Sequence, residues 1–172
     1  MKLDITDAKL AGVKLIKPPT NFEDFRGYYV ETYNREIYRE AGVTTDFIQD
    51  DISVSRKHTL RGIHGDQETW KLVTCLHGAF YLAVVNNDPS SPQYRQWEGF
   101  TLSDTNRLQV LIPPKFGNGH LVLSDWAIFH YKQNSNYNRA GQFTLLWNDP
   151  ALNIWWPVKE PLLISQRDLG VG

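Results

Sequence analysis

Side chains that could carry proton chemistry are concentrated in residues 60–73, which read LRGIHGDQETWKLV. Two cations, Arg61 and Lys71, lie on either side of His64 in this stretch. A histidine has an ordinary pKa of about 6.5, so it can take up and return protons near neutral pH. Two neighbouring glycines leave room beside it for a ligand to approach. The stretch therefore predicts an acid–base site with cations close by.

The alternation of side chains along a β-strand restricts which of these residues can share a site. Successive side chains point to opposite faces, so Leu60, Gly62 and His64 are expected on one face and Arg61 on the other. Arg61 can reach the same site only if a β-bulge at a glycine breaks the alternation. Histidines in strands are commonly ordinary core or surface residues, so the assignment depends on the rest of the chain.

Other kinds of site have less support in the sequence. The five histidines form no His-x-His or HExxH motif, so we expect no metal, although three of them could still meet in a barrel. No GxSxG motif is present, and Cys75 lies in an apolar run where a buried thiol is expected. Without a glycine-rich phosphate loop, the phosphates of a nucleotide would have to be held by side chains such as Arg26, Arg61 and Lys71.

Composition and charge exclude several classes of protein. The 172 residues are expected to form one domain, residues 1–172, with enough apolar surface to bury a core. A net charge of −1 gives no basic field for a nucleic-acid partner. No apolar stretch is long enough to span a membrane, and the first residues lack the core of a signal peptide. A single cysteine suits a reducing compartment, so we expect a cytoplasmic protein.

Short β-type runs recur at near-regular spacing between turn sequences. Only residues 35–41, which end before Gly42, have the pattern of a short helix. Breaks are expected at residues 86–92 and 113–119, and loops beyond Trp147. This pattern predicts an all-β sandwich or barrel. The expected strands are residues 12–16, 27–33, 51–55, 71–76, 79–85, 99–102, 108–112, 120–123 and 127–132.

The order of several motifs resembles one family over nearly the whole chain. The family's D-x-R-G-x-F-x-E is matched by DFRGYYVE at residues 24–31, and its Q-D-N-x-S-x-S by QDDISVS at residues 49–55. Its L-R-G-L-H-Y-Q with a following K-L-V is matched by LRGIHGDQ and KLV within residues 60–73. The later motifs follow in order as IPP, FGNG, WNDP and SQRD. The chain thus resembles the nucleotide-diphospho-4-keto-6-deoxysugar 3,5-epimerases.

The resemblance implies a cupin-like double-stranded β-helix, or jelly roll, with short peripheral helices. It implies a homodimer that acts on a nucleotide-diphosphate sugar and needs no metal or organic cofactor. The family's reaction inverts C3 and C5 of a 4-keto-6-deoxy sugar. Because the keto group acidifies both C–H bonds, a base can form an enolate that is then reprotonated on the opposite face.

The resemblance also implies a role for each residue of the reaction. His64 corresponds to the base, and Asp168 to the carboxylate that orients it and supports its charge. Lys71 would stabilise the enolate oxygen electrostatically, and Tyr131 corresponds to the acid that delivers the new proton. This division of roles is chemically reasonable, since inversion needs a proton acceptor and a proton donor on opposite faces of the ring.

Further positions match residues that bind the substrate in the family. The resemblance assigns binding of the nucleotide, its diphosphate or the sugar to Arg26, Glu31, Gln49, Arg61 and Tyr137, with Asn118 at the position of a pocket histidine. Some of these side chains reach across the dimer in relatives, which would also relieve the restriction on Arg61.

The chain departs from the family at several of these motifs. Gly65 replaces the aromatic residue after the base, Asp51 replaces an asparagine, and Asn118 replaces the histidine. Asn86 and Asp88 replace the acid and the base of a V-D-x-R motif. We expect the space opened at Gly65 to accept a bulkier sugar or a different nucleotide. The pattern is more similar to the branch that acts on GDP-linked 4-keto heptoses than to the dTDP-rhamnose branch.

Alternative functions remain open on the sequence alone. The same acid and base could serve an epimerase that acts at C3 only or at C5 only. A cupin sugar ketoisomerase would move the carbonyl group instead of inverting a centre. A metal-binding cupin or a non-catalytic sugar-binding domain would use the same fold without this chemistry.

Overall fold

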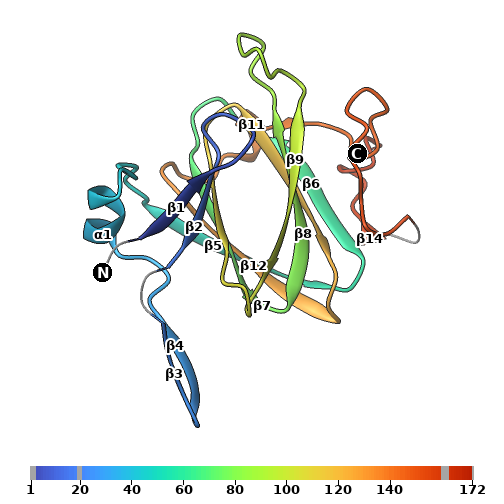
Figure 1. The fold of residues 1–172 in the computed structure, drawn as a ribbon. Coiled ribbons are helices and arrows are strands. Elements are labelled where there is room, and N and C mark those ends of the chain that lie inside the picture. Colours follow the sequence, from blue (N-terminus) through green and yellow to red (C-terminus); the bar gives the residue numbers. More distant parts are fainter. Residues whose placement is uncertain (1–2, 19–20, 160–162, 172) are drawn as a thin grey trace.

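The computed structural model describes residues 3–18, 21–159 and 163–171. Its main body is two sheets packed face to face, antiparallel except for the short parallel pair of β14 and β6 (Figure 1). The first sheet has the order β1 (Asp4–Asp7), β2 (Lys14–Lys17), β10 (Gln109–Ile112), β7 (Lys71–His77), β12 (Trp126–Gln133) and β5 (Gln49–Arg56). The second has the order β13 (Phe143–Thr144), β6 (Thr59–Gly65), β11 (Phe116–Val122), β8 (Ala79–Asn86) and β9 (Trp97–Ser103), with β14 (Leu163–Ile164) beside β6. The predicted all-β jelly roll is confirmed.

Strand β8 shows how alternation builds two apolar layers from one strand. Phe80, Leu82 and Val84 face the core between the sheets, whereas Tyr81 and Val85 pack outward against the C-terminal segment. All of these side chains are buried. Burying one such apolar side chain contributes about 1.5–3 kcal/mol, so a strand that is apolar on both faces is held firmly between its neighbours β11 and β9.

The outer face of the first sheet is covered by the short helix α1 (Arg35–Glu40) and the residues after it. The side chain of Asn34 caps the helix by accepting hydrogen bonds from the first-turn backbone N–H groups. Tyr38 is buried beneath the helix, and its hydroxyl lies 2.5 Å from Oε1 of Gln109. The predicted helix is therefore confirmed to within one residue. Over the ranges that the structure describes, no helix is long and apolar enough to cross a membrane.

The hairpin of β3 (Asn21–Asp24) and β4 (Gly27–Val30) projects from the body of the protein (Figure 1). Within the described ranges, these two strands pair only with each other. The strand predicted to run to Tyr33 therefore ends earlier, at Val30. The hairpin exposes Phe22, Phe25 and Tyr29, and Phe25 is 97% exposed.

The predicted break at residues 113–119 is wrong over its second half, because β11 begins at Phe116. Gly117 and Gly119 mark close packing of the strand instead of a turn. A Cβ atom at Gly117 would lie 2.7 Å from a methyl carbon of Ile63, and one at Gly119 would lie 3.0 Å from the carbonyl oxygen of Arg61. Glycine in a strand can mark such a close approach of another backbone, and here that backbone is β6.

The strict alternation expected for β6 is also wrong, because a bulge interrupts the strand. Asn118 of β11 pairs with His64, but His120, only two residues further, pairs with Arg61. The extra residue falls at Gly62, whose φ of 111° favours glycine. Arg61 and His64 therefore face the same side of the strand. From the sequence, this arrangement is expected only if a β-bulge at a glycine breaks the alternation of side chains.

Gly65 opens no space toward a sugar, contrary to expectation. A Cβ atom there would lie 2.2 Å from the carbonyl oxygen of Phe116 and 2.6 Å from the ring of Phe143. Phe143 belongs to β13, which pairs with the end of β6. The room left by the missing side chain is therefore filled by a neighbouring strand and its aromatic ring.

We predict that Gly65→Ala lowers the free energy of unfolding by about 1–3 kcal/mol, since the added methyl group overpacks this junction. The measurement is the urea midpoint of the purified variant. Gly141→Ala is the control, because its Cβ would meet only the flexible amide of Asn138, at 3.1 Å. Equal stability of Gly65→Ala and the wild type would show that the junction is looser than described.

Candidate active site

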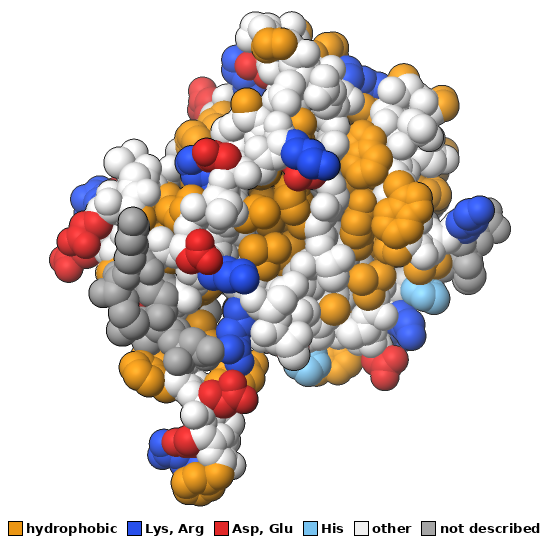
Figure 2. Space-filling model, in the orientation of Figure 1, with side chains coloured by type: hydrophobic (Ala, Val, Ile, Leu, Met, Phe, Trp, Pro, Cys, Tyr) orange, Lys and Arg blue, Asp and Glu red, His pale blue; other side chains and the backbone are white. Residues whose placement is uncertain are grey.

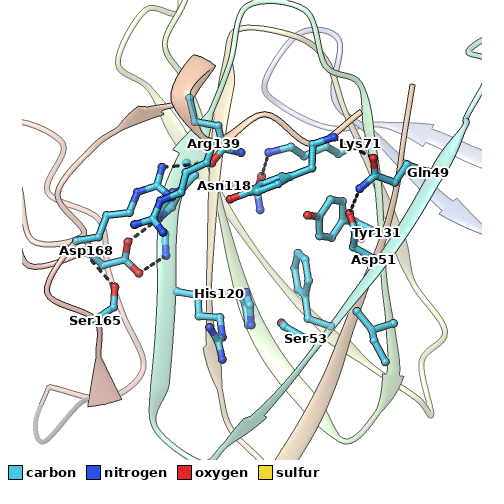
Figure 3. A pocket seen from close by; sticks show the side chains of 18 of the residues that line it. Gln49, Asp51, Ser53, Lys71, Asn118, His120, Tyr131, Arg139, Ser165 and Asp168 are labelled. Atoms are coloured by element: carbon cyan, nitrogen blue, oxygen red, sulfur yellow. Dashed lines mark hydrogen bonds and ion pairs between the residues drawn. The ribbon is translucent and has the colours of Figure 1, made fainter. Parts of the chain in front are cut away.

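A cavity of about 990 Å³ opens between the strands, and polar side chains from both sheets line it (Figure 3). Strands β5, β7 and β12 form one wall, and β6 and β11 form the other, while segments near residues 137–142 and 165–168 lie at its rim. The structure brings most of the sequence-predicted site residues together here: Gln49, Arg61, His64, Lys71, Asn118, Tyr131, Tyr137 and Asp168.

His64 and Asp168 form the most closely coupled pair in the cavity. Nε2 of His64 lies 2.5 Å from Oδ1 of Asp168, and the backbone N–H of Gly62 donates to Oδ2 at 3.2 Å. The backbone N–H of Asp168 donates in turn to the hydroxyl of Ser165. Burial alone raises the pKa of Asp168, but the hydrogen bonds from His64 and Gly62 lower it overall. The carboxylate is therefore charged and fixed, so it can orient the imidazole and stabilise its protonated form.

Lys71 lines the same cavity, and its hydrogen-bond partner is a neutral side chain. Its Nζ donates to Oδ1 of Asn118 at 3.2 Å, and the residue is only 8% exposed. Burial lowers the pKa of Lys71 to about 8, and the more distant charge of Asp66 opposes this only in part. The ammonium is protonated at neutral pH and points its charge at whatever occupies the cavity.

Tyr131 lies on the wall opposite Asp168, next to Asp51 (Figure 3). The two residues face each other across the β12–β5 pair. Burial, followed by the negative charge of Asp51, raises the pKa of the Tyr131 phenol well above its ordinary value. The phenol is therefore protonated over the whole physiological range and can act as a proton donor toward the cavity.

Gln49 holds Asp51 in place. Its Nε2 donates to Oδ2 of Asp51 at 2.7 Å, and its Oε1 accepts from the backbone N–H of Tyr137 at 2.9 Å. Both ends of the Gln49 amide are therefore engaged within the protein. This network ties the segment that carries Tyr137 to strand β5.

Four cations line the cavity without a carboxylate partner within 4 Å among the described residues: Arg61, Lys71, Arg139 and Arg167. Nε of Arg61 donates to the hydroxyl of Ser55 at 2.9 Å, and Arg167 donates to Oε1 of Gln142 at 3.2 Å. Only two carboxylates line the same cavity, and one of them pairs with His64. The unpaired positive charge favours an anionic ligand.

Arg26 and Glu31 are not brought to the cavity of their own chain. Arg26 lies on the projecting hairpin and pairs with Asp24 at 2.6 Å, and Glu31 follows strand β4. The described part of the chain contains no group of three or more His, Cys, Asp or Glu side chains arranged to hold a metal ion.

Several cavity residues were not predicted as site residues: Ser53, His120, Arg139, Gln142 and Arg167. The alternation of β5, which places residues 49, 51, 53 and 55 on one face, could have identified Ser53. His120 follows Asn118 by two residues in β11, so the same alternation could have identified it, whereas Arg139, Gln142 and Arg167 lie outside the long strands, where periodicity gives no signal. The rings of His120 and Phe129 stack with their centroids 4.2 Å apart. Burial lowers the pKa of His120 to about 3, so its imidazole is neutral near pH 7.

The fold and the cavity define an acid–base enzyme of the cupin-like class, with a carboxylate-supported histidine on one wall and a phenol on the other. The family described as dTDP-4-dehydrorhamnose 3,5-epimerase matches residues 7–171 of this sequence. The chain belongs to this family and is an isomerase.

The individual relatives agree with this assignment. The dTDP-4-dehydrorhamnose 3,5-epimerase of Shigella flexneri is 41% identical over 159 residues, which cover 90% of this chain and 87% of the relative. A dTDP-6-deoxy-D-glucose-3,5-epimerase from Legionella pneumophila, solved in complex with dTDP-4-keto-L-rhamnose, has a TM-score of 0.92 and 35% identity, covering 98% of this chain and 90% of its own. A 3′-monoepimerase from Streptomyces bikiniensis, solved with dTDP-quinovose, has a TM-score of 0.88 and 29% identity, covering 95% and 84%.

The buried ammonium of Lys71 should leave a signature in the pH dependence of stability. Its pKa is about 8 in the folded chain against an ordinary 10.5, so the unfolded chain binds more protons between these values and stability rises across that interval. We predict that Lys71→Met removes this rise and stabilises the protein at neutral pH by about 1–3 kcal/mol, after the loss of the Asn118 hydrogen bond.

Urea unfolding at neutral pH and near pH 10 measures both effects of the Lys71→Met substitution. Lys9→Met, at an exposed position, is the control and should leave the pH dependence unchanged. A wild type whose stability stays flat between pH 8 and pH 10 would contradict the prediction.

Proposed function

We propose that the chain epimerises a nucleotide-linked 4-keto-6-deoxy sugar at C3, at C5 or at both. The observation that carries this proposal is the His64–Asp168 pair, which faces Tyr131 across a cavity that also contains Lys71. Inversion at a carbon next to a ketone requires a base on one face, an acid on the other and a cation at the ketone oxygen. A non-catalytic sugar-binding domain gives no reason for a base and an acid on opposite walls.

In the proposed reaction, His64 removes a proton from the carbon beside the ketone. The electron pair of the broken C–H bond delocalises onto the ketone oxygen, where the ammonium of Lys71 stabilises the negative charge. The phenol of Tyr131 then gives its proton to the same carbon from the other face, and the carbonyl is restored. Asp168 stabilises the imidazolium until it returns its proton to solvent, and the phenolate regains one from solvent.

The nucleotide diphosphate of the proposed substrate fits the charge of the cavity. Arg61, Arg139 and Arg167 supply forked donors that suit phosphate oxygens, and none is neutralised by a carboxylate among the described residues. Arg139 and Arg167 come from the rim segments, so the diphosphate would lie toward the opening and the sugar further in, between His64 and Tyr131. No organic cofactor or metal enters the proposed reaction.

The finer choice of substrate is part of the proposal. Asn118, Asn86 and Asp88 depart from the family motifs in the way that suggests a GDP-linked 4-keto heptose, made for a capsule polysaccharide, in place of a dTDP-linked hexose. Gly65 gives no support for a bulkier substrate, since Phe143 fills the space beside it. The alternative is the dTDP-4-keto-6-deoxy hexose on which the named relatives act.

We further propose that the chain acts as a homodimer in the cytoplasm. The projecting hairpin presents Phe22, Phe25 and Tyr29 to solvent, as the orange tip in Figure 2 illustrates. Strand β5 is a free edge of its sheet and exposes Val54. An unpaired edge and protruding aromatic side chains are features that a second copy could cover. In such a dimer, Arg26 and Glu31 would be able to reach the cavity of the second copy.

We predict that His64→Ala lowers solvent exchange at C3 and C5 by about 10²- to 10⁴-fold, whereas Tyr131→Phe retains exchange but loses inversion to a similar degree. The measurement is deuterium incorporation from heavy water, located by NMR, with dTDP-4-keto-6-deoxyglucose and a GDP-4-keto-6-deoxyheptose as substrates. His77→Ala, an exposed histidine outside the cavity, is the matched control.

Unimpaired exchange in His64→Ala would overturn the mechanism. A carbonyl moved to another carbon in the product would favour a ketoisomerase. Turnover of the dTDP-hexose with none of the GDP-heptose would reject the heptose branch. Deuterium at one carbon only would assign a single-centre epimerase.

The dimer proposal has its own test in size-exclusion chromatography with light scattering. The wild type is expected at twice the mass of the 19.9 kDa chain, and Val54→Lys or Phe25→Lys should shift it toward the monomer. Tyr94→Lys, at an exposed aromatic residue outside the hairpin and β5, is the control. A wild-type monomer would contradict the proposal.

A further inference from the structure

Among the described residues, Asp51 is the one carboxylate lining the cavity that does not contact His64. It lies directly opposite Tyr131 in the β5–β12 pair, and both side chains face the cavity. Directly opposite residues in an antiparallel pair have Cβ atoms about 4.5–5.5 Å apart. Figure 3 shows the carboxylate and the phenol side by side.

The carboxylate is held in place without being neutralised. Gln49 donates to its Oδ2 at 2.7 Å, and no Lys, Arg or His lies within 4 Å of it among the described side chains. The next residue, Asp50, points to the other face, where it pairs with Lys132 at 2.8 Å. Asp51 therefore has no cationic partner beside the phenol, although the cavity is otherwise lined by cations.

The groups around Tyr131 leave Asp51 as its main electrostatic neighbour. Strand β7 presents the apolar Val73 opposite Tyr131, and Lys71 lies two residues further along and donates to Asn118. From the segment after β12, the phenol of Tyr137 also contributes. His64 and its carboxylate lie on the far wall. The charge of Asp51 opposes the formation of a phenolate, and the pKa of Tyr131 is raised accordingly, after the larger effect of burial.

We propose that Asp51 restrains Tyr131 as a proton donor and so determines how often an enolate is protonated on the inverting face. This inference rests on the proposed function. When Tyr131 gives its proton to the enolate carbon, it leaves a phenolate next to a carboxylate, and this repulsion slows the transfer. The competing event is the return of a proton from the His64 imidazolium to the original face. Asp51 is thus a specificity-determining residue that favours release of exchanged but uninverted sugar.

The test compares inversion with exchange in heavy water for the wild type, Asp51→Asn and Asp50→Asn. Asparagine keeps an oxygen that can accept from Gln49, so the variant removes the charge with little change of shape. A like charge at this distance shifts a pKa by about one unit or more, and proton-transfer rates follow acid strength. We expect the ratio of inverted product to exchanged, uninverted substrate to rise at least about threefold in Asp51→Asn. Asp50→Asn, on the outer face, should leave the ratio unchanged.

A double substitution separates action through the phenol from a general structural effect. Asp51→Asn should not change the ratio when it is introduced into Tyr131→Phe, because the phenol through which it acts is gone. A ratio that is unchanged or lower in Asp51→Asn, or that rises equally in Asp50→Asn, would overturn the inference while leaving the proposed function intact. A wild type that exchanges neither dTDP-4-keto-6-deoxyglucose nor a GDP-4-keto-6-deoxyheptose would overturn both.

Discussion

The site depends on the interruption of strand β6 at Gly62. This residue adopts a positive φ, shifts the pairing with β11 by one residue and turns Arg61 and His64 to the same side. Its backbone N–H does not take part in regular pairing with the neighbouring strand and donates to Asp168 instead. Only a residue without a Cβ fits, since a methyl group there would lie 2.6 Å from the carbonyl oxygen of Asn118. One backbone irregularity therefore positions His64, Asp168 and the cation of Arg61 together.

The electrostatics of the cavity divide its two walls into different roles. On one wall, the fixed carboxylate of Asp168 orients the imidazole of His64. On the other wall, burial and then the charge of Asp51 raise the pKa of the Tyr131 phenol, so it stays protonated but releases its proton less readily. Between them, Lys71 is buried beside the neutral Asn118, and its charge is left for the substrate. The two walls thus place an imidazole beside a fixed carboxylate and a protonated phenol in one cavity.

Departures from the family motifs have different physical consequences in the folded chain. Gly65 looks permissive in sequence, yet the ring of Phe143 occupies its space, so the substitution changes packing and not the volume available to a sugar. Replacing the asparagine of the motif by Asp51 changes the shape of the side chain little, yet it places a carboxylate next to the phenol of Tyr131. The effect of a side chain's shape or charge depends on the residues of the neighbouring strand, and a sequence motif does not show which residues those are.

The sequence by itself determined the class of the fold and the short helix, and its motifs predicted most of the residues that meet in the cavity, among them His64, Lys71, Tyr131 and Asp168. Alternation and turn residues report local structure directly, and the motifs recorded the family's order of residues. Tertiary structure alone decided that Arg61 joins His64, that Phe116 begins a strand, and that Arg139 and Arg167 reach the cavity. These outcomes depend on contacts between segments far apart in the chain, where a bulge or a loop breaks the periodicity on which sequence reasoning relies.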